Sequence, residues 1–390
     1  SSSCITTMLH TGEHCVHNSS QIVALFSLLL HIAQSYHELM TETAVRFVDV
    51  KNITRWAAQQ GVENIMLGMI DYIEADFRRW PVFDKCARLG SHSDVGVIEL
   101  MPTSDGEEYG FKYVNGHPSN PATGHQTVTA FGVLADVATG YPTFWSEMTV
   151  LTALRTAATS AMVAKRLARP DSATIALIGN GTQSEFQALA MRAALGINSV
   201  RVWDTDRAAM EKFVRNAEPL GFDVSVASSA HDAVRGADIV TTCTADKASA
   251  TVLTADMIEP GMHINAIGGD CPGKTELDAR ILTMGDVFVE FPDQTWVEGE
   301  IQQMPADFPI TELWKVFIGE AAGRTSPDQI TIFDSVGFAI EDFAALRYLR
   351  DAVDGTDFYA LVDLIADPSD PKNLFGLIAD ARVPVLSGGA

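Results

Sequence analysis

An acidic residue that follows two glycines is the first group in this sequence with the type and setting of a catalytic side chain. The apolar run that ends at Ile267 leads into Gly268, Gly269 and Asp270, and Lys274 follows four residues later. Open α/β sheets bind their ligands beyond the carboxyl ends of the strands, where this acid is expected to lie. We therefore predict that Asp270 is a general acid or base. A turn acid that caps the next helix is the alternative.

Two basic residues lie in apolar, strand-like runs. They are Arg88 and Lys112, and Glu99 lies between them in the sequence. A buried cation requires an anionic partner. A guanidinium matches a carboxylate with two parallel hydrogen bonds, and an ammonium adds a point charge. The pair therefore indicates a carboxylate-binding site. An internal ion pair with Glu99 or with a surface acid is the alternative, which the pattern alone slightly favours.

A glycine turn between an apolar run and an amphipathic run predicts a dinucleotide site. The run 175–178 ends in Gly179-Asn-Gly181, and a helical pattern covers 185–195. Such a turn offers free N–H groups and the positive end of a helix to a pyrophosphate. Ser184 replaces the third glycine of the common fingerprint. By itself, the turn is equally consistent with a purely structural role.

A second acid supports the dinucleotide interpretation. Asp204 ends the strand-like run 199–204 and lies 25 residues after Gly179, close to the spacing expected of the acid that binds the adenosine ribose. A helix N-cap before 207–217 is the alternative. Together the two signals predict a dinucleotide site. An acid here favours NAD over NADP, although Arg207 nearby weakens that preference.

A third segment of interest is 333–337, which includes Ser335 and Val336. An apolar strand ends there in small polar residues, which suits a loop that closes over a nicotinamide ring. A simple structural turn is the alternative, and it is the one that the pattern alone favours.

The elements that must position these residues alternate between strands and helices. This order predicts an α/β protein with a Rossmann-like doubly wound domain and a mixed α/β domain. We predict strands at 95–101, 109–114, 175–178, 199–204, 224–227, 238–243, 263–267, 286–291 and 330–333. We predict helices at 67–78, 149–168, 185–195, 207–217, 230–236, 255–258, 275–282, 296–303 and 339–352. The segment from Pro368 has little periodicity and is expected to fray.

Composition limits the class of protein. A chain of 390 residues suggests two domains, and a net charge of −23 argues against nucleic acid and anionic membranes as partners. The five cysteines lie far apart, so neither a zinc site, nor any other metal site, nor a disulfide framework is predicted. This spacing suits a reducing cytoplasm.

Residues 1–39 differ from the rest, because they contain no Lys or Arg but half of the histidines. The apolar run 22–30 lacks the positive segment of a signal peptide and is too short to span a bilayer. We expect a poorly ordered leader that was appended or spuriously translated, with Met40 as the natural start.

Five blocks of the sequence resemble one family of enzymes. They are RTAATS (155–160), IGNGTQSEFQA (178–188), INAIGGDCPGKTEL (264–277), EGEIQQ (298–303) and FDSVGFAIED (333–342). The chain is similar, from about residue 47 to about 350, to the ornithine cyclodeaminase/mu-crystallin family, which also contains an archaeal alanine dehydrogenase. Residues 1–39 and about the last twenty lie outside the resemblance.

The resemblance implies a role for individual residues. Asp270 is implied as the catalytic acid/base. The implied substrate contacts are Arg88 and Lys112 on the α-carboxylate, Arg155 and Val336, with Glu99 on the δ-ammonium group. The implied cofactor contacts are Thr127, Arg155, Gly179, Gly181, Thr182, Gln183, Asp204, Thr244, Ile267, Gly268, Gly269, Lys274 and Ser335.

The resemblance also implies the activity. L-ornithine would become L-proline and ammonia through hydride transfer to tightly bound NAD⁺, cyclisation of the imine, loss of ammonia and re-reduction. A lysine cyclodeaminase, an NAD(P)-dependent ketimine reductase or amino-acid dehydrogenase, and a non-catalytic dinucleotide-binding protein are the alternatives. The implied assembly is a homodimer built through the substrate domain. That domain is expected at 40–168 and 330–390, around an NAD-binding domain at 169–329.

Overall fold

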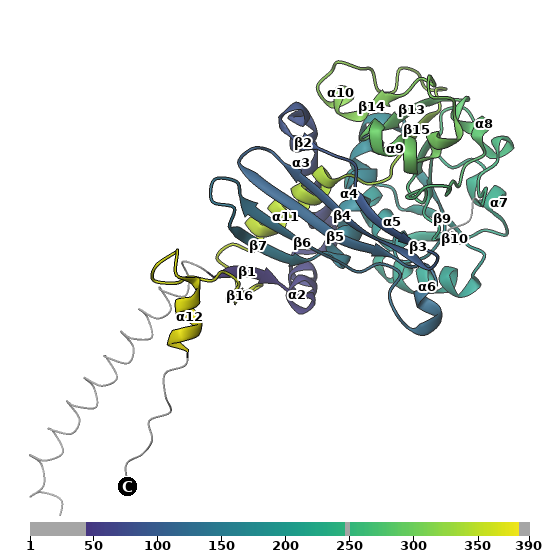
Figure 1. Cartoon of the computed structure of the whole chain (residues 1–390). Helices are drawn as coiled ribbons and strands as arrows, with labels where there is room; N and C mark the ends of the chain where they lie inside the picture. The colour runs from purple at the N-terminus through teal and green to yellow at the C-terminus, as the bar shows by residue number, and fades with distance from the viewer. Residues whose placement is uncertain (1–43, 246–249, 382–390) are drawn as a thin grey trace, which may run out of the picture. The chain divides into compact units, whose positions relative to one another are not determined.

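The computed structural model describes residues 44–245 and 250–381 (Figure 1). They form two compact units, one over 47–360 and one that contains the described parts of 1–46 and 361–390. All the candidate site residues lie in the larger unit. The predicted leader, 1–39, lies outside the described residues. The domain boundaries predicted within the larger unit remain predictions.

A parallel sheet forms one half of the larger unit. Its strand order is β10-β9-β8-β11-β12-β15-β13-β14, and every neighbouring pair is parallel. The strands are β8 (Thr174–Ile178), β9 (Ser199–Trp203), β10 (Asp223–Val226), β11 (Ile239–Thr242), β12 (His263–Ala266), β13 (Asp286–Val289), β14 (Thr311–Glu312) and β15 (Thr331–Asp334). The chain turns to opposite sides after β8, so the switch point of a doubly wound sheet lies between β8 and β11. The predicted Rossmann-like fold is confirmed.

The residues of these strands explain their place in the sheet. Residues 175–178 are fully buried, as expected of a parallel strand that is covered on both faces. The helices of this half are α4 (Thr149–Leu167), α5 (Ser184–Leu195), α6 (Arg207–Ala217), α7 (Ala230–Val234), α8 (Ala279–Leu282), α9 (Pro292–Glu298) and α10 (Leu313–Phe317). The short 3₁₀ turns are η3 (Glu218–Leu220), η4 (Ala255–Met257) and η5 (Glu300–Gln303).

An antiparallel sheet forms the other half. Its strands follow the order β7-β6-β5-β4-β2, and β3 also pairs with β4. They are β2 (Asp84–Lys85), β3 (Leu89–Ser93), β4 (Gly96–Ser104), β5 (Glu108–Gly116), β6 (Ala130–Asp136) and β7 (Pro142–Glu147). Burial alternates along β4 and β5, so Glu99 and Lys112 point to the buried face.

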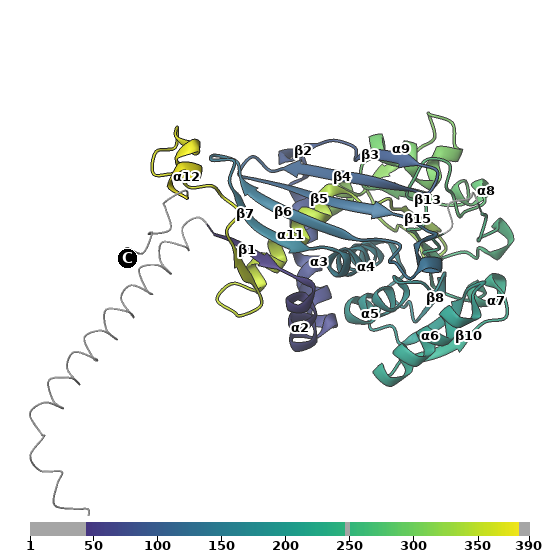
Figure 2. The same ribbon diagram turned by 60° about the horizontal axis from the view of Figure 1, so that its bottom comes forward.

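Helices cover the buried face of this sheet. α11 (Ala339–Ala352) contacts β4, β5 and β6, and α3 (Val62–Arg78) packs against α11 and α4 (Figure 2). Two further elements, α2 (Val50–Gln60) and the 3₁₀ turn η1 (Trp80–Val82), complete the helical layer, and η2 (Asn120–Thr123) lies in the loop before β6. One apolar cluster joins both halves, since it includes Phe77 on α3, Phe144 on β7 and Leu177 on β8. The core therefore fixes the antiparallel strands beside the edge of the parallel sheet.

Two sequence predictions of secondary structure are wrong. The predicted helix 275–282 is helical only over α8, because Leu277 forms a parallel bridge with Leu253 and Asp278 caps the helix. The segment after Pro368 contains α12 (Leu374–Asp380), which begins where the Asn373 side chain accepts a hydrogen bond from the Gly376 N–H. A local cap thus starts a helix whose apolar residues show little period.

Strands β1 (Val45–Val48) and β16 (Ala360–Val362) span the boundary between the two units. Across residues 44–245 and 250–381, no helix combines the length and the apolar character needed to span a membrane.

Candidate active site

The carboxyl ends of five strands gather the predicted residues at one edge of the parallel sheet. Because the strands are parallel and adjacent, the segments that follow them meet there. β8 leads into Gly179, β11 into Thr244, β13 into Glu290, β12 into Ile267 and β15 into Ser335. The three motifs that the sequence suggested independently therefore belong to one site.

The glycine turn has the geometry that a dinucleotide needs. Gly179 has a φ of +94°, and a Cβ there would lie 2.8 Å from the Cys243 carbonyl oxygen, so only glycine fits. A Cβ on Gly181 would meet nothing within 4 Å, which leaves room for a ligand. α5 starts without a side-chain cap, and the buried amide of Asn180 has no partner among the described residues. Free donors at a helix start fit the pyrophosphate of NAD.

Asp204 lies against this turn. Its carboxylate accepts hydrogen bonds from the Asn180 N–H at 2.5 Å and the Asp206 N–H at 2.8 Å. Asp206, not Asp204, caps α6 by accepting from Ala208 N–H. Thr182 is exposed beside the turn, and Gln183 immediately precedes α5. These positions are those expected of groups that contact a dinucleotide.

Arg88 lies at the centre of a group of carboxylates. Its Nη1 is 3.1 Å from Glu99 and its Nε is 3.0 Å from Glu298. Nη2 donates to the carbonyl oxygens of Val336 and Gly337. The paired acids raise the pKa of Arg88 although burial opposes them, so the guanidinium stays charged.

Lys112 and Arg155 share a second group of carboxylates. Lys112 Nζ is 2.8 Å from Asp342, and Arg155 is 2.8 Å from Asp342 and 2.6 Å from Glu341. Burial and the charge of Arg155 lower the pKa of Lys112 to about 8, although Asp342 opposes them. The structure thus places three cations, from β5, α4 and the turn before β3, near one edge of the sheet.

Asp270 is the most accessible acid of the site, with 55% of its side chain exposed. Lys274 Nζ lies 3.2 Å from its carboxylate and also donates to the Thr244 carbonyl oxygen at 3.2 Å. The charge of Asp270 also acts on Arg88. Asp270 therefore has both the access and the polar surroundings that a general acid or base needs.

Three buried carboxylates connect the loops of the site in series. Asp334 accepts from the N–H groups of Glu300 and Ile301 at 2.8 and 2.9 Å. Glu300 accepts from the N–H groups of Glu276 and Leu277 at 2.7 and 3.0 Å, and Glu276 accepts from the Thr244 N–H at 3.0 Å. We call Asp334, Glu300 and Glu276 the carboxylate chain. It joins the end of β15, the turn η5, the loop after β12 and the loop after β11.

A second acid holds the turn after β15. Glu290, fully buried at the end of β13, accepts from the Ser335 hydroxyl and from the Gly337 N–H. Gln294 accepts from the Arg88 N–H at 3.0 Å and donates to the Gly337 carbonyl oxygen at 2.9 Å. The turn that contains Ser335 and Val336 is therefore fixed to Arg88.

The described contacts of one predicted residue, Thr127, are local, and its cofactor contact remains a prediction. Thr127 is in the loop before β6, where its carbonyl oxygen accepts from the His117 N–H at 2.9 Å. None of the described contacts joins it to the glycine turn.

Sequence reasoning did not identify several residues that the structure places here. Glu298, Glu290, Glu341 and Asp342 are buried acids that contact the predicted residues or their turn. Buried acids are costly unless paired. Glu341 and Asp342 follow the apolar residues 338–340, which was the available signal for these two acids, whereas Glu298 lies in the mostly polar block EGEIQQ.

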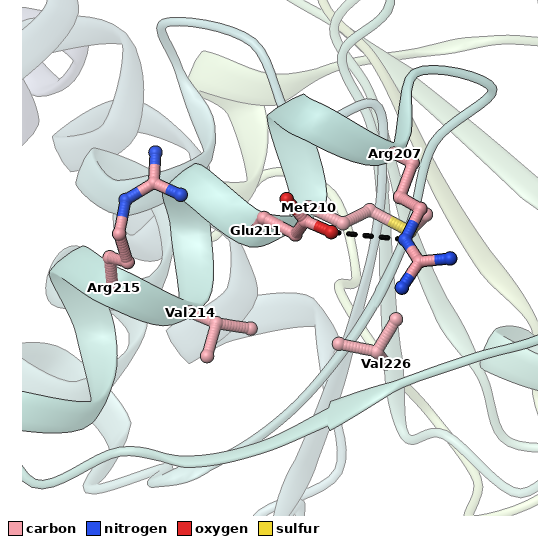
Figure 3. Close-up of a pocket in the computed structure, with 6 residues that line it drawn as sticks. All are labelled: Arg207, Met210, Glu211, Val214, Arg215 and Val226. Carbon is pink, nitrogen blue, oxygen red and sulfur yellow. Dashed lines mark hydrogen bonds and ion pairs between the residues drawn. The ribbon is translucent and has the colours of Figure 1, made fainter.

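A separate hollow of about 620 Å³ lies between α6 and β10 (Figure 3). Its lining is Arg207, Met210, Glu211, Val214, Arg215 and Val226, and none of these is a predicted site residue. Arg207 and Glu211 form an ion pair there at 3.0 Å.

Comparison with known proteins gives consistent results. A family model described as the ornithine cyclodeaminase/mu-crystallin family matches residues 50–357. An ornithine cyclodeaminase of Agrobacterium fabrum is 59% identical over 334 residues, which are 86% of this chain and 94% of that protein.

Two solved structures have the same fold. A lysine cyclodeaminase, described with the basis for its recognition of L-lysine, L-ornithine and L-2,4-diaminobutyric acid, has a TM-score of 0.77 and 33% identity. The match covers 84% of this chain and 97% of that one. An archaeal alanine dehydrogenase dimer with bound NAD has a TM-score of 0.74 and 30% identity, with coverage of 83% and 100%.

Proposed function

The chain belongs to the ornithine cyclodeaminase/mu-crystallin family, and we propose that it is an ornithine cyclodeaminase that recycles bound NAD⁺. The observation that supports this most directly is that Arg88, Lys112 and Arg155 lie within range of one another's charge and that the charge of Asp270 acts on Arg88. Three cations suit the α-carboxylate of an amino acid, and the adjacent acid suits its α-ammonium group. The 59% identity to an ornithine cyclodeaminase supports ornithine as the substrate.

The proposed reaction starts at the α-carbon. Asp270 takes a proton from the α-ammonium group, while Arg88 and Lys112 hold the carboxylate. Bound NAD supplies the hydride acceptor and, later, the hydride donor, so the net reaction is redox-neutral. Between these steps the δ-ammonium group passes a proton to the Glu99 carboxylate, the neutral δ-amine attacks the α-imine carbon, and ammonia leaves with a proton that Asp270 returns.

The residues of the site supply orientation and electrostatics. Ring closure needs the δ-nitrogen close to the imine carbon, so both ends of the substrate must be fixed. We propose that Glu99, on the same buried sheet face as Lys112, receives the δ-ammonium group. The glycine turn, Thr182, Gln183 and Asp204 are the groups proposed to hold NAD.

The proposal is tested by incubating the purified protein with L-ornithine and no added cofactor. We expect L-proline and ammonia in equal amounts without net NADH. If neither forms, added NAD⁺ distinguishes loss of cofactor from loss of activity. Turnover of L-lysine in place of L-ornithine would assign the chain as a lysine cyclodeaminase instead, since one methylene changes pocket affinity by only about 1–3 kcal/mol. Net NADH from L-alanine would contradict the proposal.

A variant tests the role of Asp270. Asp270→Asn cannot exchange a proton with the α-amine, so proline formation should fall by at least about a hundredfold. Because Asp270 is exposed and contacts only Lys274 by hydrogen bond among the described residues, NAD content should stay near that of the wild type. Normal turnover by this variant would show that another group moves the proton.

We further propose a cytoplasmic homodimer that is built through the antiparallel sheet. The face opposite α11 carries apolar side chains that are exposed in the single chain, among them Ile98, Leu100, Tyr109 and Phe131. Aromatic rings lie in contact across this face, with Tyr113 and Phe131 stacked at 5.0 Å. A contiguous apolar surface of this kind suits an interface, and a solved relative is described as a dimer.

A further inference from the structure

The guanidinium of Arg88 lies between two buried acids from different halves of the larger unit. Glu99 comes from β4 of the antiparallel sheet, and Glu298 is the last residue of α9. Their carboxylates lie 3.1 and 3.0 Å from Arg88, and only 5% and 6% of these residues are exposed. Arg88 therefore brings Glu298 beside the acid that sequence resemblance connects with the distal amine.

This group of side chains has an excess of negative charge. Glu99 and Glu298 both pair with Arg88, and Asp270, which Lys274 neutralises, also acts on it, so two buried carboxylates share one guanidinium. Glu99 Oε1 is buried and accepts no hydrogen bond from any described residue, and Arg88 Nε, 3.0 Å from Glu298 Oε2, is the one cation paired with Glu298 among the described residues. A substrate carboxylate bound to Arg88 would increase the excess. Buried carboxylates without enough partners are costly, so the arrangement calls for a cationic ligand group.

We propose that Glu298 is a specificity-determining residue that, together with Glu99, binds the distal ammonium group of a diamino-acid substrate. This inference rests on the proposed function and extends it to a residue of the same site. An ammonium group has three donors, so it can bond both carboxylates at once. Asp270, being exposed and bonded to Lys274, remains available for the α-amine.

The protonation behaviour of Glu298 agrees with this assignment. Burial raises the pKa of Glu298 to about 7 against the opposing charge of Arg88, and the neighbouring acids Glu99 and Asp270 also raise it. A cation that binds next to Glu298 favours its ionised form. The distal ammonium group thus supplies the positive charge that favours the ionised form of Glu298.

Two ligands that differ only in the distal ammonium group provide the test. 5-Aminovalerate and valerate both lack the α-amine, so neither can be oxidised, and both keep the carboxylate. Their dissociation constants are measured by calorimetry on the NAD-loaded enzyme. The wild type should bind 5-aminovalerate at least about tenfold more tightly, as expected for charge-assisted hydrogen bonds.

The ratio of the dissociation constant of valerate to that of 5-aminovalerate measures the preference for the distal ammonium group. In Glu298→Gln we expect this ratio to fall by about tenfold while the affinity for valerate stays within about twofold. Glu298→Asp keeps the charge and should retain part of the preference for 5-aminovalerate. It replaces Glu298→Gln in the test if that variant does not fold. Exposed Glu320 provides the matched control, since Glu320→Gln should leave both constants unchanged. The unfolding temperature and NAD content confirm that each variant is intact.

Two results would overturn the inference. An unchanged ratio in Glu298→Gln would show that Glu298 does not contact the distal ammonium group. An equal loss of affinity for both ligands would show that Glu298 only supports Arg88. Failure of the wild type to form proline from L-ornithine would instead contradict the proposed function, which the ornithine assay detects separately.

Discussion

Lys112 shows how a buried cation in this site depends on a distant acid. The sequence suggested that it needs an anion, and the structure supplies Asp342, 230 residues away, at 2.8 Å. Arg88 likewise forms the internal ion pair with Glu99 that was the alternative interpretation. The pair does not exclude a substrate, because Glu99 Oε1 has no hydrogen-bond partner in the described part of the chain. Its role in binding remains a prediction.

The lowered pKa of Lys112 predicts a pH dependence of carboxylate binding. Its ammonium group is charged below a pKa of about 8 and loses its proton above it. The dissociation constant for valerate should therefore rise by up to about tenfold per pH unit above about pH 8, where Glu298, with a pKa of about 7, is already ionised and the ligand itself does not titrate. Calorimetry on the NAD-loaded enzyme measures it.

Lys112→Arg is the matched variant for this prediction. A guanidinium stays charged throughout this range, so the alkaline loss of affinity should disappear even if the affinity itself changes. If the wild type bound valerate equally well from about pH 7 to 9.5, Lys112 would not supply the charge that holds the carboxylate.

The loops of the site are held by acids rather than by helices. Residues 275–278 are not helical: Leu277 forms a parallel bridge with Leu253, and the Glu300 carboxylate accepts from the N–H groups of Glu276 and Leu277. Gly268 has no room for a Cβ, which would lie 2.1 Å from Glu276. The carboxylate chain therefore determines the path of the loop that contains Asp270.

We predict that Glu300→Gln loosens this loop. Its two carboxylate oxygens accept two backbone N–H groups, and an amide offers only one acceptor, so one buried N–H loses its partner. The free energy of unfolding should fall by about 1–3 kcal/mol, and kcat for L-ornithine should fall with it. Thermal unfolding and steady-state kinetics measure both.

Glu107 is exposed on the antiparallel half and provides the control for Glu300. Glu107→Gln should leave the free energy of unfolding within about 0.5 kcal/mol of the wild type. A Glu300→Gln protein with wild-type stability and kcat would mean that the carboxylate chain does not determine the loop.

At the scale of the whole molecule, the two faces of the antiparallel sheet carry different kinds of side chain. Phe131, Tyr113 and Trp145 point outward, whereas Glu99 and Lys112 point to the buried face. One set of strands thus carries exposed apolar side chains on one face, which we propose binds a second copy of the chain, and charged side chains on the face toward the site. Disruption of the outer face should therefore leave cofactor binding largely intact.

Phe131→Asp tests the dimer. A carboxylate in the centre of an apolar interface is strongly unfavourable, so the variant should sediment as a monomer while it retains NAD. Leu220 is equally apolar and exposed on the parallel half, so Leu220→Asp should remain a dimer. A wild-type protein that sediments as a monomer would contradict the proposed interface directly.

The sequence alone determined the features that depend on neighbouring residues. The run 175–178, the turn at Gly179 and the helix start at Ser184 are adjacent in the chain, so their pattern predicts strand, turn and helix. The helix 339–352 follows from local period in the same way, and the alternation of strands and helices predicted the doubly wound sheet. Arg88, Lys112 and Asp270 were identified because a charged residue in an apolar or glycine-rich segment costs free energy when it is buried without a partner.

Only the tertiary structure decided which residues meet. Glu298 lies 210 residues beyond Arg88, and Asp342 lies 230 beyond Lys112, so no local period relates them. Their contacts exist because the core packs the antiparallel strands and α11 against the carboxyl edge of the parallel sheet. Because these charges are buried, removal of one member of a pair would leave the other without a compensating charge. Local pattern thus specifies the elements, and long-range packing specifies the chemistry that they bring together.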